Sequence, residues 1–312
     1  MRILKNGFIL QNALNGSRIS SFGAFFALQV LAKIKKAHLQ CDGADVRKVR
    51  ETMIIDMHAH IFPDKIAEKA TRGIESFYDI EMDAVGSVTN LMKEGERAGI
   101  DRFVVHSVAT TAAQVESINR FIVGTVEQYP DKLLGFATMH PDYEGIQQEL
   151  EWAMEHGLKG VKIHPDFQKF RIDDEKAYPL YECIEGRIPL LVHTGDYRYE
   201  YSEPERMARV MDRFPKLDVI GAHFGGWSIW EKAAEILGGR RIWVDTSSSL
   251  YSITPQTARR LMDAYGVDRV LFGSDFPMWT PKEELERFMQ IPLTDEEREL
   301  ILWKNAAKLL GV

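Results

Sequence analysis

Cysteine is scarce in this sequence: its 312 residues include only Cys41 and Cys183. Two cysteines cannot build a disulfide framework, so we expect a reducing compartment, the cytoplasm. Long apolar runs are also missing, because none reaches the roughly 18 residues that a membrane-spanning helix needs. The hydrophobic fraction of 45% and the charged fraction of 27% are typical of a globular protein.

Basic residues are fewer than acidic ones in this sequence. The formal net charge is −7 at pH 7, which offers no electrostatic footprint for a nucleic acid. Residues 1–52 contain nine Lys or Arg and three Asp or Glu, a net charge of +6, which leaves −13 for residues 53–312. We therefore predict a basic extension over residues 1–52 and one domain over residues 53–312. Met53, just before the first predicted strand, is our candidate for the functional start of the protein.

The basic extension has no clear pattern of helices or strands. Residues 20–36 could form an amphipathic helix. Residues 22–32 also have the length of the apolar region of a signal peptide, but the lysines that follow at once argue against secretion. We therefore expect an extension that is not part of the main fold.

The stretch IIDMHAH, residues 54–60, has the pattern of a buried strand that ends in a His-x-His pair. Side chains alternate along a strand, so Asp56, His58 and His60 are expected on one face. Two such imidazoles can bind one metal ion, and Asp56 could orient one of them. A His-x-His pair alone is equally consistent with a polar strand end, so the other strands must supply further ligands.

Eight short apolar runs alternate with longer helical patterns after Met53. The runs are residues 53–57, 102–106, 133–140, 160–164, 188–193, 217–223, 241–245 and 269–273. The helical patterns cover residues 88–98, 111–129, 143–156, 174–185, 203–214, 228–237, 254–265 and 294–310. Several runs are rich in Val and Ile without polar alternation, as in strands buried on both faces. This order predicts the α/β class and a slightly distorted (β/α)8 barrel of the TIM type.

An open, doubly wound sheet is the competing fold. It would more often begin with a glycine-rich turn after the first strand, where this chain has His58-Ala59-His60.

Histidine is concentrated at the predicted carboxyl ends of the strands, the end of a barrel that carries the active site. Seven of the nine histidines lie there: His58, His60, His106, His140, His164, His193 and His223. Asp275 follows the eighth predicted strand. Four imidazoles, those of His58, His60, His193 and His223, and this carboxylate form a donor set that suits Zn²⁺ or a similar divalent ion.

Lys162 shares a face of the fourth predicted strand with His164. A lysine that points into a barrel mouth is costly unless it is paired or modified. Three interpretations stay open: Lys162 binds a substrate carboxylate, it is carbamylated and bridges two metal ions, or it extends its amine to water.

From Met53 onward the chain resembles the amidohydrolase superfamily, in particular its compact TIM-barrel branch of metal-dependent hydrolases and decarboxylases. The motifs that carry the resemblance are IDMHAH (55–60), GVKIHP (160–165), VHTG (192–195), AHFGG (222–226), GSDFP (273–277) and NAAKLL (305–310). Residues 2–7 resemble the first strand of the β-sandwich that flanks the barrel in some members. No strands are predicted after the last helix, so we expect no such domain.

The resemblance implies that His58, His60, His193 and Asp275 hold one metal ion, and that His223 is a general acid or base. In binuclear members, residues in the positions of His223 and a carbamylated Lys162 hold a second ion. The expected cofactor is a divalent metal, with zinc and a single ion favoured and two ions left open.

The resemblance also implies two reactions. In the first, a metal-bound water with a pKa of about 7 attacks an amide, lactone or ester bond of a small organic substrate. Asp275 would take the proton of this water, His223 would polarise the carbonyl or protonate the leaving group, and Lys162 would stabilise the oxyanion. The alternative is non-oxidative decarboxylation of a small carboxylic acid, aromatic in some relatives, with Asp275 protonating carbon.

Loops after the strands supply candidates for binding such a substrate. They are His164, Trp227, Tyr197 and Trp279, and Arg171 or Arg198 could clamp a carboxylate. Barrel DNases with two metals are disfavoured, since they usually carry Glu on the fourth strand and this domain is acidic. A metal-free binding protein is disfavoured because every ligand type is present. The expected partner is a small molecule, and a homodimer is compatible with the sequence.

Overall fold

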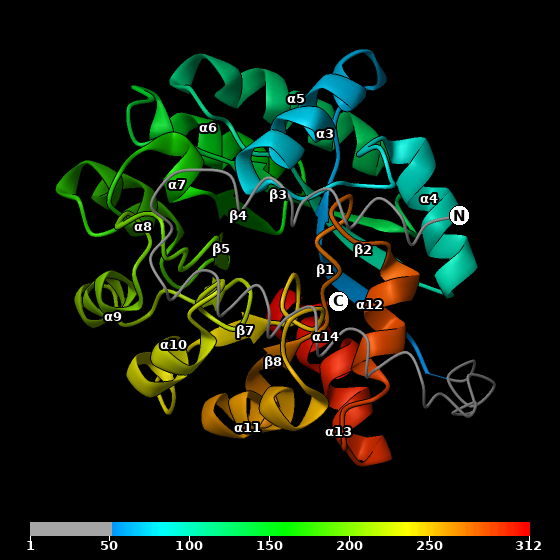
Figure 1. Ribbon diagram of the computed structural model, residues 1–312. Coiled ribbons are helices and arrows are strands. Elements are labelled where there is room, and N and C mark those ends of the chain that lie inside the picture. Colours follow the sequence, from blue (N-terminus) through cyan, green and yellow to red (C-terminus); the bar gives the residue numbers. More distant parts are fainter. Residues whose placement is uncertain (1–51) are drawn as a thin grey trace, which may run out of the picture. The chain divides into compact units, whose positions relative to one another are not determined.

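The computed structural model describes residues 52–312 (Figure 1). The hypotheses about an extension, an amphipathic helix and a signal peptide fall on residues 1–51, outside the described residues. Within residues 52–312, no helix is both long and apolar enough to cross a membrane.

Eight parallel strands form a barrel in which each strand pairs with the next one along the chain. They are β1 (Ile55–His60), β2 (Arg102–His106), β3 (Leu133–Thr138), β4 (Gly160–Ile163), β5 (Leu190–Val192), β6 (Val219–Gly221), β7 (Trp243–Asp245) and β8 (Val270–Leu271). Backbone bonds from Met57 N to Phe272 O and from Asp275 N to His58 O, both 2.8 Å, bring β8 back to β1. The predicted (β/α)8 barrel is confirmed.

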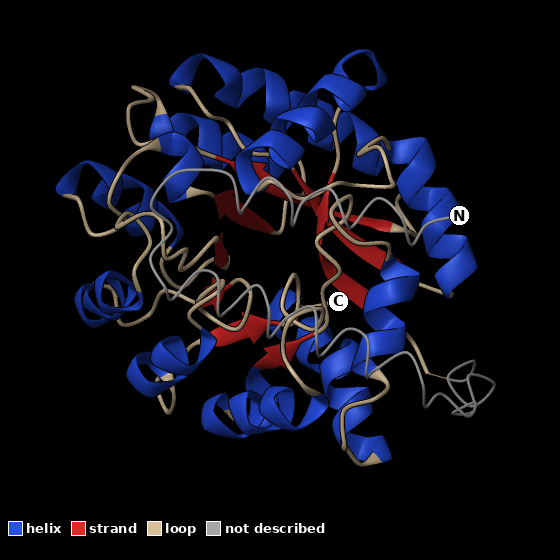
Figure 2. Ribbon diagram, in the orientation of Figure 1, coloured by secondary structure: helices blue, strands red, loops and turns tan. Residues whose placement is uncertain are grey.

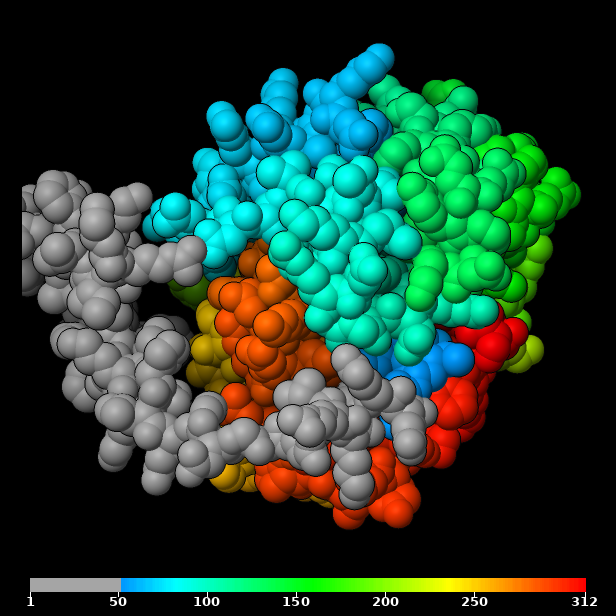
Figure 3. All heavy atoms as spheres, turned by 90° about the vertical axis from the view of Figure 1, so that its right-hand side faces the viewer, coloured from blue at the N-terminus to red at the C-terminus, as the bar shows by residue number. Residues whose placement is uncertain are grey.

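Helices surround the strands on all sides (Figure 2). They are α3 (Asp64–Tyr78), α4 (Val88–Ala98), α5 (Val115–Gln128), α6 (Ile146–Glu155), α7 (Pro165–Gln168), α8 (Tyr178–Ile184), α9 (Pro204–Arg213), α10 (Trp230–Leu237), α11 (Pro255–Tyr265), α12 (Pro281–Phe288), α13 (Asp295–Glu299) and α14 (Asn305–Leu310). A π-helical segment, Leu300–Lys304, joins the last two. Helix α12 packs beside α4, and both cover the side of the barrel seen in Figure 3.

Two apolar cores hold these layers together. The larger one lies between strands and helices. The second contains one set of alternating strand residues, among them Ile55, Val104, Leu191 and Ile220, together with Leu310 of α14. This inner core fills the barrel, so that polar side chains gather only at the carboxyl ends of the strands.

Strand β1 departs from the expected pattern. It covers Ile55–His60, in agreement with the strand predicted over residues 54–60 and beyond the apolar run at 53–57, but its register with β2 shifts between Asp56 and Ala59. Such an irregularity breaks strict alternation of side chains. The polar residues at its end, His58 and His60, are part of the strand itself.

Candidate metal centre and active site

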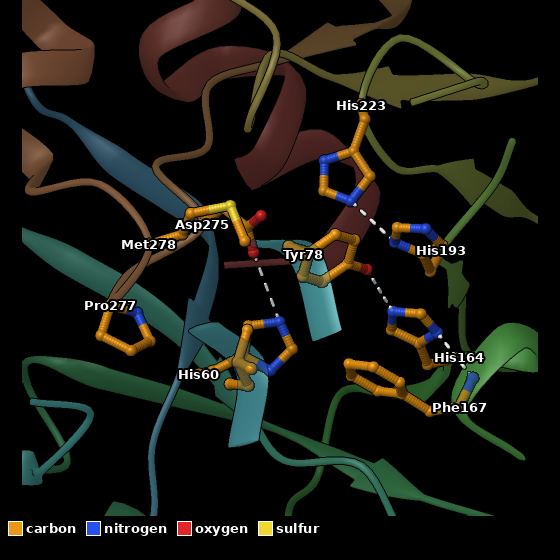
Figure 4. Close-up of a pocket in the computed structure, with 10 residues that line it drawn as sticks. His60, Tyr78, His164, Phe167, His193, His223, Asp275, Pro277 and Met278 are labelled. Atoms are coloured by element: carbon orange, nitrogen blue, oxygen red, sulfur yellow. Dashed lines mark hydrogen bonds and ion pairs between the residues drawn. The ribbon is translucent and has the colours of Figure 1, made fainter. Parts of the chain in front are cut away.

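A small cavity opens at the carboxyl ends of the strands (Figure 4). Its volume is about 20 Å³, which is room for roughly one water molecule. The lining residues are His60, Ile74, Tyr78, His164, Phe167, His193, His223, Asp275, Pro277 and Met278.

Three donor atoms converge at one wall of this cavity. Nε2 of His58 lies 3.3 Å from Nε2 of His60. Oδ1 of Asp275 lies 3.3 Å from the first of these nitrogens and 3.4 Å from the second. Adjacent ligands of one tetrahedral metal ion are separated by about 3.4 Å, given metal–ligand distances near 2.1 Å. The strand end of β1 and the turn after β8 thus form a ligand cluster with metal-site spacing.

Two more imidazoles meet at the ends of β5 and β6. Nδ1 of His193, after β5, lies 3.0 Å from Nε2 of His223, after β6. The other nitrogen of His223 lies 3.0 Å from the carbonyl oxygen of Ser247. Both His223 and Asp275 have left-handed backbone conformations, with φ of 60° and 62°, which turn their side chains over the barrel mouth.

Asp245, the last residue of β7, has the position to orient His58, a role that we expected of Asp56. Its Oδ2 lies 2.8 Å from Nδ1 of His58, and both side chains are buried. A carboxylate that holds one imidazole nitrogen leaves the other free to face a metal ion. Asp56 instead accepts hydrogen bonds from the backbone amides of His58 and Ser274, so the hypothesis that Asp56 orients a ligand is wrong.

The protonation states of the donors fit a divalent cation. Burial lowers the pKa of His58 to about 4, and it also lowers the pKa values of His60 and His193, so all three rings are neutral at pH 7. Burial opposes ionisation of Asp275, but the imidazoles around it, His58 first, hold its pKa well below the ordinary value. Neutral imidazoles and an ionised carboxylate are the ligand forms that metals bind. Nε2 of His193 is also buried without a hydrogen-bond partner.

Lys162 lies directly beneath this cluster. Its side chain is fully buried, its Nζ is 3.1 Å from Nε2 of His58, and burial lowers its pKa to about 8. The interpretation in which this amine reaches water is therefore wrong. Because an ammonium and a metal ion repel each other, metal binding would favour a neutral or carbamylated Lys162.

The four predicted substrate residues are not brought together. His164 lines the cavity and stacks on His193 at 3.8 Å between ring centroids. The side chain of Tyr197 is 75% exposed. Trp227 packs edge-on against Tyr78, and Trp279 stacks on Tyr251. The roles of Tyr197, Trp227 and Trp279 remain predictions, and none of the three lines the cavity.

Sequence reasoning missed Tyr78 and Asp245. Tyr78 ends α3, in which Ile66, Ala70, Ile74 and Tyr78 recur every four residues, a helical pattern that could have located it. The signal for Asp245 was its place at the end of a predicted strand, which it shares with the ligand candidates on other strands.

Comparisons with known proteins identify the family of this chain. The family model named Amidohydro_2, described as "Amidohydrolase", matches residues 55–312. Decarboxylase orsB from Emericella nidulans is 28% identical over 127 residues, which cover 34% of this chain and 38% of that protein. The chain therefore matches little more than a third of the length of this curated relative.

Solved structures share the fold at low sequence identity. The 5-carboxyvanillate decarboxylase LigW from Sphingomonas paucimobilis has a TM-score of 0.68 and 16% identity, over 84% of this chain and 99% of that one. A dihydroxybenzoic acid decarboxylase from a Polaromonas species has a TM-score of 0.65 and 16% identity, over 83% of this chain and 97% of that one. The latter was solved with bound manganese and the inhibitor 2-nitroresorcinol.

Proposed function

The chain belongs to the amidohydrolase family, and on this premise we propose that it is a metal-dependent carboxy-lyase that decarboxylates a small aromatic acid without an oxidant. The observation that carries the choice of reaction is that the named relatives, in sequence and in structure, are decarboxylases. They favour the alternative of the sequence analysis over its first expectation, hydrolysis.

In this proposal His58, His60, His193 and Asp275 hold one divalent ion. The convergence of His58, His60 and Asp275 and the protonation states of the donors support the assignment. His193 lies beside them through His223, 3.0 Å away, and its inclusion follows the family resemblance. When bound, the ion would withdraw charge from substrate oxygens and orient the carboxylate. Zinc has no specific support, since the relative solved with a metal holds manganese. Lys162 and His223 remain candidates for a second ion.

Asp275 would carry the proton. The bond between the ring and its carboxylate breaks, CO₂ leaves, and the ring carbon must gain a proton. The Oγ of Ser248 donates to Oδ2 of Asp275 at 2.5 Å, so this carboxylate is held with Oδ1 toward the cluster. It is ionised at neutral pH, and it would take up a proton from the substrate hydroxyl or water and deliver it to carbon.

His223 would assist at the opposite wall. Its Nδ1 lies 3.0 Å from the carbonyl oxygen of Ser247, an acceptor to which it can donate, and its Nε2 lies at the cavity, 3.0 Å from Nδ1 of His193. Nε2 of His223 can accept a proton from a substrate hydroxyl. The rings and apolar groups of Phe167, Pro277 and Met278 limit the access of bulk water to the same space.

Product analysis tests the proposal. The full-length protein, reconstituted with Mn²⁺ or Zn²⁺, is incubated with a panel of hydroxybenzoic acids and with aryl esters and lactones. We expect CO₂ release and a product lighter by the mass of CO₂, both abolished by a chelator. Hydrolysis of the esters or lactones without any CO₂ release would contradict the proposal and favour the hydrolase.

A further inference from the structure

Tyr78 reaches into the cavity from the end of α3, and its hydroxyl lies beside His164 (Figure 4). The phenolic oxygen is 2.9 Å from Nε2 of His164. The direction of this hydrogen bond decides what the hydroxyl can do.

The backbone of α7 fixes that direction. The amide of Phe167 donates to Nδ1 of His164 at 3.3 Å, as a cap on the first turn of the helix. An imidazole nitrogen that accepts a hydrogen bond carries no hydrogen, so the hydrogen of His164 is on Nε2. His164 therefore donates to Tyr78, and the phenolic hydrogen is left to donate elsewhere. No other residue between 52 and 312 accepts it.

The phenol ring is held firmly in place. Trp227 packs edge-on against it at 5.1 Å, and the guanidinium of Arg198 lies 5.2 Å from its centroid. Arg198 is itself anchored, because it donates to both carboxylate oxygens of Asp196 and, over 2.7 Å, to the carbonyl oxygen of Phe77. These bonds fix the position of the guanidinium beside the ring of Tyr78. Burial keeps the pKa of Tyr78 well above its ordinary value, so the hydroxyl stays protonated.

We propose that Tyr78 is a specificity-determining residue whose hydroxyl donates a hydrogen bond to a ring oxygen of the substrate. This inference rests on the proposed function for the class of substrate. Among aromatic acids, the hydroxyl of Tyr78 selects those that place a hydroxyl or similar oxygen beside the end of α3. A substrate without that oxygen leaves the buried donor unpaired and is bound more weakly.

Binding measurements with Tyr78→Phe test the inference without turnover. The probes are 2-nitroresorcinol and 2-nitrophenol, which differ by one ring hydroxyl, titrated into the metal-loaded protein. We expect wild type to prefer 2-nitroresorcinol. The substitution should weaken its binding about tenfold and leave 2-nitrophenol nearly unchanged. Tyr199→Phe is the matched control, because Tyr199 stacks on Phe77 but does not line the cavity.

Three results would overturn the inference: no binding of either probe to wild type, an equal loss for both probes in Tyr78→Phe, or the same loss in Tyr199→Phe. Equal losses would indicate a purely structural role. The predicted pattern in a protein that never releases CO₂ would refute the proposed function and leave the role of Tyr78 intact. CO₂ release without the pattern would refute only the role of Tyr78.

Discussion

At the scale of single residues, the centre depends on side chains that orient its ligands. Asp245 holds His58 by Nδ1, so we expect Asp245→Asn to lower the affinity for Mn²⁺ or Zn²⁺ by about 10- to 100-fold, since an amide holds the imidazole less firmly. Competition with a chromophoric chelator measures this. Asp212→Asn is the control, since Asp212 pairs with Arg240 at the surface. Equal affinities of Asp245→Asn and wild type would show that the pair does not support the metal.

The ligands themselves should behave differently from His223. We expect His193→Ala and Asp275→Asn to abolish metal-dependent activity, because each removes a proposed ligand of the ion. His223→Asn should retain at least one metal equivalent and lose turnover. Elemental analysis and rate measurements on the same samples decide this. Full activity in either ligand variant would refute the site, and loss of all metal in His223→Asn would make His223 a ligand.

At the scale of elements, sequence patterns located the strands better than the helices near the site. Strand β2 agrees to the residue, because its apolar run ends where the strand does. Strand β1 confirms the strand predicted over residues 54–60, and it extends beyond the apolar run at 53–57, which does not include its last, polar residues. Helix α3 was not predicted, although Ile66, Ala70 and Ile74 have helical spacing, and with it Tyr78 was missed. The contact between His58 and Asp245 joins residues 187 apart, which only the closed barrel brings together.

Two glycines should respond in opposite directions to replacement by alanine. A Cβ on Gly160, at the start of β4, would lie 2.6 Å from the ring of Phe136, so Gly160→Ala should destabilise the fold by about 1–3 kcal/mol. A Cβ on Gly124, inside α5, meets nothing within 4 Å, so Gly124→Ala should stabilise it by about 0.5–1 kcal/mol. Chemical denaturation gives both values. A Gly160→Ala protein as stable as wild type would contradict the packing at β4.

The last turn of α3 should depend on Arg198. Arg198→Lys keeps a positive charge near Asp196 but loses the planar fork that also reaches the carbonyl oxygen of Phe77. We expect amide exchange in this turn to accelerate by about tenfold, the effect of one lost charge-assisted bond. Arg171→Lys, in an exposed pair with Glu200, should leave exchange there unchanged. Indistinguishable exchange in Arg198→Lys and wild type would show that α3 is held by packing alone.

At the scale of the whole molecule, the barrel is expected to be sufficient for folding and metal binding. The described residues contain the complete ring of strands and every proposed ligand. A shortened chain that starts at Met53 should therefore unfold cooperatively and bind metal with the affinity of the full-length protein. Circular dichroism and metal titration check this. Failure of the shortened chain to fold or to bind metal would make residues 1–52 part of the functional domain.

We propose that strand ends far apart in the sequence hold one catalytic metal ion. Anomalous diffraction from crystals of the full-length protein loaded with Mn²⁺ tests it most directly. We expect one strong anomalous peak, bonded to His58, His60, His193 and Asp275, with Asp245 hydrogen-bonded to His58. No peak at the barrel mouth, or a metal ion there without His193 and Asp275 as ligands, would contradict it.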